Sequence, residues 1–451
     1  MTRRTGSVDW LVPIDDSTIF LEGWLNDSPG ARADLVSAAG TRVGVSDTWR
    51  RFRRPDVEKA LAESGSGGPG KAHGFACLVR VPGSPGQLSA AGTCLEVAAN
   101  GGVTEHLLPP PLTDPSRGRN RMLDQLDLEV ADRKFLAETV HPAMESLNRR
   151  VVAGARAGTV IERGSLPTSP TVSVVIPLYR RLDFLVHQLA QFALDPDLAQ
   201  AEIIYVLDSP ELASELEEVS VHLHLLYGIP IRLVFLNQNC GFAAANNLGI
   251  EQARAPVVLL FNSDVFPDQP GWLSKLLEFH RSQPKIGALG PKLLYEDGAL
   301  QHAGMYFERD IASGLWQNLH YFKGLPGEFA PSNVDRAVPA VTGACLMIAR
   351  DLYESVGGLS TSYVHGDYED SDLCLRLHER GFASWYTPQP QLFHLERQSY
   401  RSTSKPSPSG QAATAYNHWL HTEIWDDRIE AVMAEFEAVS GLGDRAEAGP
   451  V

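Results

Sequence analysis

The chain has few cysteines and no long apolar run. Its five cysteines are odd in number, lie far apart and include no C-x-x-C pair, so the sequence predicts neither a disulfide framework nor a zinc site. No apolar run approaches the roughly 18 residues that a membrane-spanning helix needs, and the N-terminus, MTRRTGSVDW, lacks the apolar core of a signal peptide. We therefore expect a cytoplasmic protein in a reducing compartment, either in solution or peripheral at the inner face of the cell membrane.

Basic charge is also scarce. The net charge is −16 at pH 7, and the one dense basic cluster is Arg50, Arg51, Arg53 and Arg54. Nucleic-acid binding requires a clustered basic surface that neutralises phosphates, so the composition argues against a nucleic acid polymer as partner. The arginine cluster fits a solvated surface better than a docking site for an anionic acceptor or a membrane face.

The pattern of apolar runs divides the 451 residues into parts. Short β-like runs between turn residues predict a small β-sandwich-like accessory domain over residues 8–112, and helical spacing predicts a helical linker over 113–168. Alternating strands and helices then predict an α/β catalytic domain over 169–400. A loop and a helix are expected over 401–438, followed by a disordered tail over 439–451.

Short polar signals follow the apolar runs of the α/β part. Because an open α/β sheet gathers ligands at the carboxyl ends of its strands, these residues are expected to meet around one ligand. The signals are Pro177-Leu178-Tyr179, Asp208-Ser209, Asn262-Ser263-Asp264 and Glu369-Asp370-Ser371-Asp372, followed by His394.

This ordered set resembles glycosyltransferase family 2 over about residues 172–399. The resemblance implies the GT-A fold, a Rossmann-like α/β domain with a mixed central sheet. It also implies an inverting enzyme that moves a sugar from a nucleoside diphosphate to a hydroxyl of a glycan or lipid-linked saccharide. Surface polysaccharide biosynthesis is an expectation from the family.

The resemblance assigns several residues to the donor. Residues just after the first strand line the nucleotide pocket in this family, which is the place of Pro177, Leu178 and Tyr179. Asp208 holds the position of a carboxylate that accepts from N3–H of uracil or thymine, which implies a UDP- or dTDP-sugar. A strand-end Asp before Pro210 is equally a good helix N-cap, so that alternative stays open.

Three further polar residues have both a ligand and a structural interpretation. Asn246 and Asn247 are expected inside a helix despite poor helix propensity, so either the donor or a neighbouring loop bonds them, with structural bonding favoured. Arg397 either steadies the diphosphate as a planar donor or forms a surface ion pair.

Asn262-Ser263-Asp264 matches the position of the family's D-x-D signature, with Asn in place of the first Asp. The resemblance implies Mg²⁺ or Mn²⁺ on Asp264 and His394, because such ions bridge carboxylates to substrate phosphates. Asn262 would bond the ribose or a water of the metal, and Ser263 lies beside it in the donor site. Whether Asn262 weakens the metal dependence stays open.

Glu369-Asp370 resembles the family's E-D motif at the start of a helix near the acceptor. By that resemblance Asp370 is the general base, with Glu369 as the next candidate. Acidic residues in a first helical turn are also stabilised there without any catalytic role.

Two other classes of function remain open. A sugar nucleotidyltransferase would share the α/β site, but its Gly-rich phosphate loop is missing after Val172–Pro177. A non-catalytic glycan-binding or scaffold protein would need only a degenerate GT-A domain, which Asn262 supports and Asp264, Asp370 and His394 oppose. The sequence names neither the sugar, the acceptor nor the oligomeric state.

Overall fold

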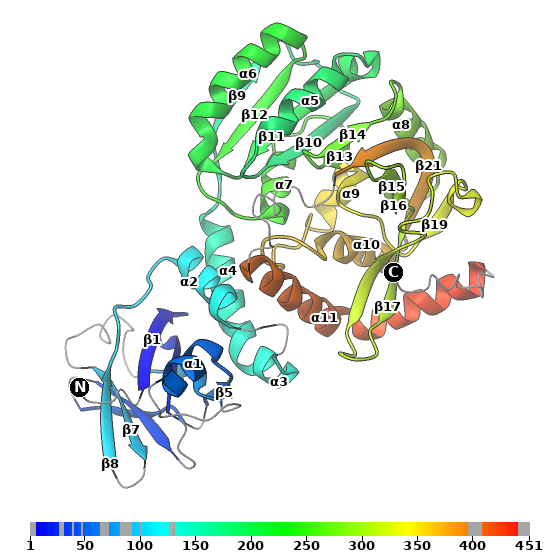
Figure 1. Cartoon of the computed structure of the whole chain (residues 1–451). Coiled ribbons are helices and arrows are strands. Elements are labelled where there is room, and N and C mark those ends of the chain that lie inside the picture. Colours follow the sequence, from blue (N-terminus) through cyan, green and yellow to red (C-terminus); the bar gives the residue numbers. More distant parts are fainter. Residues whose placement is uncertain are drawn as a thin grey trace. The chain divides into compact units, whose positions relative to one another are not determined.

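The computed structural model describes residues 6–26, 31–37, 40–46, 48–63, 72–81, 93–99, 102–126, 128, 131–395 and 408–440. The chain divides into two compact units, Met1–Ala153 and Gly154–Val451 (Figure 1). Each unit has a hydrophobic core of its own.

The described residues of the first unit form two four-stranded antiparallel sheets with the orders β1-β2-β6-β5 and β4-β3-β7-β8. Leu21 and Phe75 of one sheet and Leu95 of the other belong to the same hydrophobic core, as in a β-sandwich. The strands are β1 (Gly6–Pro13), β2 (Thr18–Leu25), β3 (Arg32–Val36), β4 (Arg42–Gly44), β5 (Arg50–Phe52), β6 (Gly74–Arg80), β7 (Cys94–Ala99) and β8 (Gly102–Leu107).

Helices follow this sandwich along the chain. Asp114 caps α2, its side chain accepting from the Ser116 and Arg117 backbone N–H groups, and Pro115 takes the first helical position. The helices of this unit are α1 (Pro55–Glu63), α2 (Pro115–Gln125), α3 (Arg133–Phe135), the π-turn η2 (Leu136–Val140) and α4 (His141–Gly154).

The residues of the arginine cluster bond to other residues of the first unit. Arg54 forms ion pairs with Glu22 at 2.5 Å, Asp9 at 3.0 Å and Asp56 at 2.7 Å, and only 11% of its side chain is exposed. Arg51 donates to the Ala72 carbonyl at 3.0 Å. The expectation of a solvated surface is therefore wrong for Arg54, because Asp9 and Glu22 come from strands that are far away in sequence.

An eleven-stranded sheet forms the centre of the described part of the second unit, with the path β14-β21-β15-β20-β13-β10-β11-β12-β9. Strands β10 to β13 pair in parallel, whereas β20 joins β13, and β14 joins β21, in antiparallel fashion. The predicted mixed central sheet is therefore confirmed. The strands are β9 (Ala157–Arg163), β10 (Val172–Leu178), β11 (Ala201–Leu207), β12 (Ile231–Leu236), β13 (Val257–Phe261), β14 (Val265–Pro267), β15 (Ile286–Leu294), β16 (Leu300–His302), β19 (Arg336–Val338), β20 (Cys345–Ala349) and β21 (Ala383–His394).

The parallel strands are almost uninterrupted apolar runs because both of their faces are buried. Strand β9 is different: most of its residues are partly or fully exposed at the sheet edge, where it pairs with β12. The sequence pattern predicts a helical linker at these residues instead, since an exposed edge strand has no buried face to give an apolar alternation.

Further helices and one ribbon complete the second unit (Figure 1). The antiparallel ribbon of β17 (Met305–Arg309) and β18 (Trp316–His320) contacts the C-terminal helix α11. None of the described helices combines the length and the apolar character that crossing a bilayer requires. The helical segments are α5 (Asp183–Phe192), η3 (Pro196–Gln200), η4 (Pro210–Leu212), α6 (Ala213–Tyr227), α7 (Phe242–Ile250), α8 (Trp272–Ser282), η5 (Ala330–Ser332), α9 (Arg350–Ser355), α10 (Glu369–Glu379) and α11 (Pro408–Ser440).

Candidate active site

Three of the predicted donor segments follow β13, β10 and β11, which are neighbours in the sheet. The backbone N–H of Asp208, after β11, donates to the carbonyl of Leu178, at the end of β10, at 2.9 Å. The sheet therefore brings the strand ends together at one edge, as expected of a parallel arrangement.

Sheet register brings Asp264 and His394 together. Strand β14 begins directly after Asp264 and pairs with the end of β21, so that Val265 lies opposite His394. The Leu395 backbone N–H also donates to the Asp264 carbonyl at 3.1 Å. As a result, His394 Nε2 lies 3.3 Å from Asp264 Oδ1, and both side chains are largely buried.

Asn262 starts the turn that carries Asp264. Its backbone N–H donates to the Ala344 carbonyl at 2.9 Å, and its carbonyl accepts from Gln188 Nε2 at 2.9 Å. Its side-chain oxygen is buried and has no hydrogen-bond partner among the described residues. Ser263, the next residue, is partly buried.

The atoms gathered here fit a divalent metal ion. A carboxylate oxygen and an imidazole nitrogen are suitable ligands for a divalent ion, and the unpartnered oxygen of Asn262 would bond a water of the ion or the ribose. Within the described residues, no group of three or more His, Cys, Asp and Glu side chains forms a metal site by itself.

Asp208 holds a turn. Its Oδ1 accepts from the Cys240 N–H at 2.7 Å and from Cys240 Sγ at 3.3 Å, and its Oδ2 accepts from Asn239 Nδ2 at 2.8 Å and the Gly241 N–H at 3.0 Å. These donors account for the roughly four acceptor sites of a carboxylate. The helix-cap interpretation does not describe these contacts, because the segment after Asp208 has no side-chain cap.

The residues after β10 differ in exposure. Leu178 is 1% exposed and belongs to the hydrophobic core, so the structure gives this side chain a packing role in place of the expected contact with the donor. Pro177 and Tyr179 are partly buried, and the Arg180 guanidinium lies 4.8 Å from the centre of the Tyr179 ring.

The two asparagines of α7 bond within the protein. Asn247 accepts from the Leu359 N–H at 3.0 Å and the Tyr353 hydroxyl at 2.5 Å, and it donates to the Leu359 carbonyl. Asn246 is fully buried and donates to the Phe242 carbonyl at 2.9 Å. The contacts of Asn247 match the structural alternative. Asn246 donates within its own helix and its buried Oδ1 has no hydrogen-bond partner among the described residues, so its contact with the donor stays a prediction.

The loop before α10 has an unusual backbone. His365, Asp367 and Tyr368 have φ values of 64°, 81° and 77°, which non-glycine residues rarely adopt. Backbone strain of this kind is kept where the surrounding structure enforces it, and it gathers at functional sites. Here it ends directly before Glu369 and Asp370.

Glu369 and Asp370 have different surroundings. Both oxygens of the Asp370 carboxylate accept backbone hydrogen bonds, from the Gly343 N–H at 2.8 Å and the Ser371 N–H at 2.7 Å. Burial raises the pKa of Asp370, and these two donors oppose the rise. Burial, and then the charges of Asp370 and Asp367, raise the pKa of Glu369 well above its ordinary value. The arrangement favours an ionised Asp370 beside a protonated Glu369.

Part of the chain is similar to a known protein family. A family model described as Glycosyl transferase family 2 matches residues 173–357. The chain is similar to that family over this segment. Asp264 lies inside the matched family 2 segment, whereas Glu369, Asp370 and His394 follow it along the chain.

Individual relatives cover limited parts of the sequence. The O-antigen biosynthesis protein RfbC of Myxococcus xanthus is 30% identical over 56% of this chain and 19% of its own length. The N-acetylglucosaminyl-diphospho-decaprenol L-rhamnosyltransferase of Mycobacterium tuberculosis is 28% identical over 38% of this chain and 60% of its own. This chain thus spans less than two thirds of either relative. A crystal structure of GalNAc-T7 with UDP, GalNAc and Mn²⁺ is 16% identical, with a TM-score of 0.45 over 61% of this chain and 52% of its own.

Helix α11, beyond the family 2 segment, braces the loop before α10. Asn417 accepts from the Val364 N–H at 2.9 Å and donates to the Gly366 carbonyl at 2.6 Å. The rings of Tyr368 and His418 stack, with their centroids 5.6 Å apart and an interplanar angle of 10°. The loop conformation is therefore held by side chains of a distant helix.

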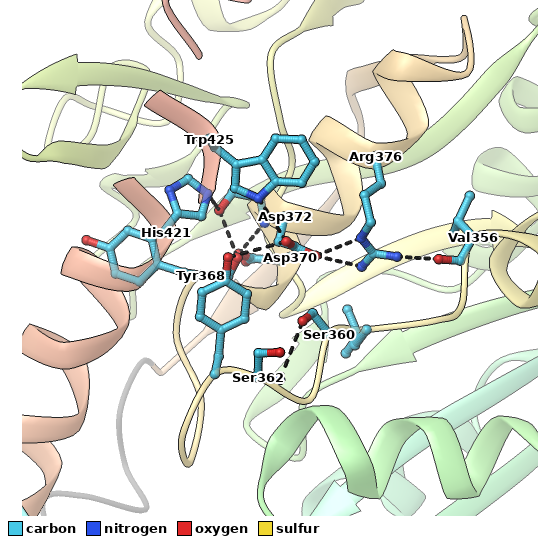
Figure 2. A network of polar contacts seen from close by, with 12 residues as sticks. Val356, Ser360, Ser362, Tyr368, Asp370, Asp372, Arg376, His421 and Trp425 are labelled. Carbon is cyan, nitrogen blue, oxygen red and sulfur yellow. Dashed lines mark hydrogen bonds and ion pairs between the residues drawn. The ribbon is translucent and has the colours of Figure 1, made fainter. Parts of the chain in front are cut away.

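The same helix reaches the first turn of α10, as Figure 2 shows. His421 Nε2 lies 3.1 Å from Ser371 Oγ, and Trp425 Nε1 donates to Asp372 Oδ1 at 2.9 Å. Burial lowers the pKa of His421 to about 3, which keeps this ring neutral. Asp372 also forms an ion pair with Arg376 at 2.7 Å, so it is bound within the structure.

The sequence predicts this helix but not its role. Asn417, His421 and Trp425 recur every four residues, which places polar and aromatic groups on one face of the helix. This spacing is the sequence signal for a polar and aromatic face on α11, although it does not show which part of the chain that face contacts. Arg397 and the residues after Ser440 lie outside the described residues.

Proposed function

We propose that this protein is an inverting glycosyltransferase that moves a sugar from a nucleoside diphosphate to a hydroxyl of a glycan or lipid-linked saccharide. The observation that carries the proposal is the 3.3 Å contact between Asp264 and His394, which the sheet register sets up at the end of β13. The similarity of residues 173–357 to glycosyl transferase family 2 supports it.

On the donor side, Asp264 and His394 would hold Mn²⁺ or Mg²⁺. The ion would supply a Lewis acid beside the diphosphate when bound. The unpartnered oxygen of Asn262 would accept from a ribose hydroxyl or from a water of the ion. Because Asn262 carries no charge, it would contribute less to metal affinity than an aspartate at the same place.

On the acceptor side, Asp370 acts as the general base. It takes the proton of the acceptor hydroxyl, whose oxygen bonds to the anomeric carbon as the bond from that carbon to the diphosphate oxygen breaks. The Gly343 and Ser371 N–H groups keep the two carboxylate oxygens in place during this step. Glu369 remains protonated beside them.

The donor nucleotide is proposed to be UDP or dTDP. This preference rests on the position of Asp208 at the end of β11. To accept from a pyrimidine N3–H, Asp208 Oδ1 would have to give up its contact with Cys240 Sγ, which at 3.3 Å is the longest of its four. Binding of a guanosine diphosphate as tight as that of uridine diphosphate would limit Asp208 to holding the turn.

The acceptor is proposed to be an intermediate of surface polysaccharide synthesis. The names of two relatives support this class, since one takes part in O-antigen biosynthesis and the other transfers L-rhamnose to a diphospho-decaprenol-linked sugar. With a lipid-linked acceptor, the enzyme would act at the inner face of the cell membrane.

A screen of nucleotide sugars with Mn²⁺ tests the proposal. A ligand at one hundred times its Kd stabilises the folded state by about 2.7 kcal/mol, so a donor should raise the melting temperature. The screen then measures which nucleotide product is released. Release of a nucleoside diphosphate supports glycosyl transfer, release of pyrophosphate would indicate a nucleotidyltransferase, and stabilisation without turnover in the presence of glycan acceptors would favour a binding protein.

A further inference from the structure

Gln301 is a buried residue that contacts the candidate metal site from a third strand. It lies in β16, which pairs with β15, and β15 pairs in turn with β21, where His394 is the last residue. Gln301 is 3% exposed, and its Nε2 lies 2.8 Å from His394 Nδ1. The Gln301 Oε1 atom is buried and has no hydrogen-bond partner among the described residues.

The tautomer of His394 depends on which atom of the Gln301 amide faces its ring. If Gln301 Nε2 donates to Nδ1, the ring proton is on Nε2, from which it points at Asp264 Oδ1, 3.3 Å away. In that state the histidine has no lone pair on Nε2 and so cannot bind a metal ion beside Asp264.

The opposite orientation of the Gln301 amide makes the Nε2 lone pair of His394 available. The O and N atoms of a glutamine side chain exchange places by a half-turn, and the hydrogen-bond network decides between them. With Oε1 toward the ring, Gln301 accepts from Nδ1–H, and the unpartnered oxygen gains a donor. The Nε2 lone pair of His394 then faces the Asp264 carboxylate. The lone pair and the carboxylate oxygen repel each other unless a cation lies between them.

We propose that Gln301 is a positioning residue that couples the tautomer of His394 to metal binding. Without metal, its amide donates to Nδ1 and His394 donates to Asp264; with metal, the amide is reversed and Nε2 is released as a ligand. The inference rests on the proposed function, since it takes Asp264 and His394 as the metal ligands. Metal-ligating histidines generally donate their other N–H to an acceptor of this kind.

The neighbouring histidine does not replace Gln301. His302 Nδ1 contacts His320 Nδ1 at 2.9 Å, and His302 Nε2 accepts from the Gly304 N–H at 3.3 Å. Both ring nitrogens of His302 are therefore engaged away from His394.

Two substitutions at Gln301 distinguish its hydrogen bonding to His394 from a packing role. Gln301→Met keeps the length of the side chain and removes the acceptor, whereas Gln301→Glu keeps an acceptor and adds charge to a buried place. Gln317→Met, on β18, is the matched control. Mn²⁺ affinity is measured at about pH 8, where imidazole is neutral, from the electron paramagnetic resonance signal of free Mn²⁺ with UDP present.

We expect Gln301→Met to weaken Mn²⁺ binding about 10- to 100-fold, and Gln301→Glu and Gln317→Met to bind Mn²⁺ about as tightly as the wild type. A purely structural role predicts the reverse order for the two Gln301 variants, because the interior tolerates Met better than Glu. Wild-type affinity in Gln301→Met would overturn the inference. Equal Mn²⁺ binding by wild type and His394→Ala would instead overturn the proposed metal site.

A second measurement is made on the wild-type protein and does not depend on the folding of the Gln301 variants. The ¹⁵N chemical shifts of the His394 ring, assigned by their loss in His394→Ala, report which nitrogen carries the proton. We expect the proton on Nε2 without metal and on Nδ1 once Mg²⁺ and UDP have saturated the thermal stabilisation of the protein. An unchanged tautomer once the stabilisation is saturated would contradict the coupling. The absence of any stabilisation by Mg²⁺ and UDP would instead contradict the proposed metal site.

Discussion

Replacing Asp370 with Asn removes the proposed proton acceptor and keeps the shape of the side chain. The carboxylate accepts from the Gly343 and Ser371 N–H groups at 2.8 and 2.7 Å, and an amide can accept from only one of them. Its NH₂ group would face the other donor. The variant therefore loses a hydrogen bond as well as a base.

The two losses have different sizes and act on different quantities. The lost hydrogen bond, with a donor left unpaired, costs about 1–3 kcal/mol of stability in this loop. Loss of a general base costs about 10²- to 10⁴-fold in rate, which corresponds to about 2.7–5.4 kcal/mol in activation free energy. Nucleotide and Mn²⁺ binding should survive, because Asp370 is not one of the proposed metal ligands.

Glu369→Gln is the matched control, since it replaces the neighbouring carboxyl, which we expect to be protonated already. Sugar transfer, nucleotide affinity and melting temperature are measured on both variants. We expect Asp370→Asn to lower kcat and kcat/KM equally, which places the lost interaction in the transition state. Glu369→Gln should retain most of the rate.

The pH dependence gives an independent check. A base must be deprotonated to act, so kcat should rise with pH through the pKa of the carboxyl pair. Burial raises that pKa above the ordinary aspartate value of 3.8, and the rising limb should lie above that value. Near-normal transfer by Asp370→Asn, or loss of transfer in Glu369→Gln alone, would refute the assignment of the base.

Three further changes test other parts of the structure. Asp264→Ala and His394→Ala should each weaken nucleoside diphosphate binding and abolish its dependence on Mn²⁺ in calorimetric titrations, and unchanged binding in both would exclude them as ligands. Asn417→Ala removes hydrogen bonds of about 1 kcal/mol each from the loop before α10, so transfer should fall while Mn²⁺ affinity stays; equal losses of both would point to general unfolding. Burial raises the pKa of Glu22 from 4.5 to about 7, so the folded first unit binds this proton more tightly than the unfolded chain and loses stability as pH rises between these values. Melting curves between about pH 5 and pH 8 should therefore show a smaller loss for Glu22→Gln than for the wild type.

Parallel strands and their ends could be predicted from the sequence because they depend on local patterns. Apolar runs such as Val172–Leu178 and Val257–Phe261 are visible without a structure, and parallel strands place the residues after their carboxyl ends at one edge of the sheet. The meeting of Asp264 and His394 followed from the same reasoning together with the family resemblance. Edge strand β9 was not predicted, because its mostly exposed residues show no alternation of apolar and polar side chains.

The partners of individual side chains could not be predicted in this way. Asp208 bonds the turn at Asn239–Gly241, a loop whose conformation no local pattern specifies. Asn417 contacts the loop before α10 and His421 contacts the first turn of α10, each about fifty residues earlier in the chain. Their spacing on α11 indicates a polar face but does not show what that face covers. Long-range contacts of single residues depend on the packing of whole elements.

Two buried amide oxygens belong to residues of the candidate metal site. Asn262 Oδ1 and Gln301 Oε1 both lack a hydrogen-bond partner among the described residues. Leaving such an atom buried and unpaired costs about 1–3 kcal/mol, and native proteins keep few of them without a reason. A bound ion and its nucleotide would satisfy Asn262 directly and Gln301 through the tautomer of His394. The cost of the unpaired oxygens in the empty site would then be offset by ligand binding.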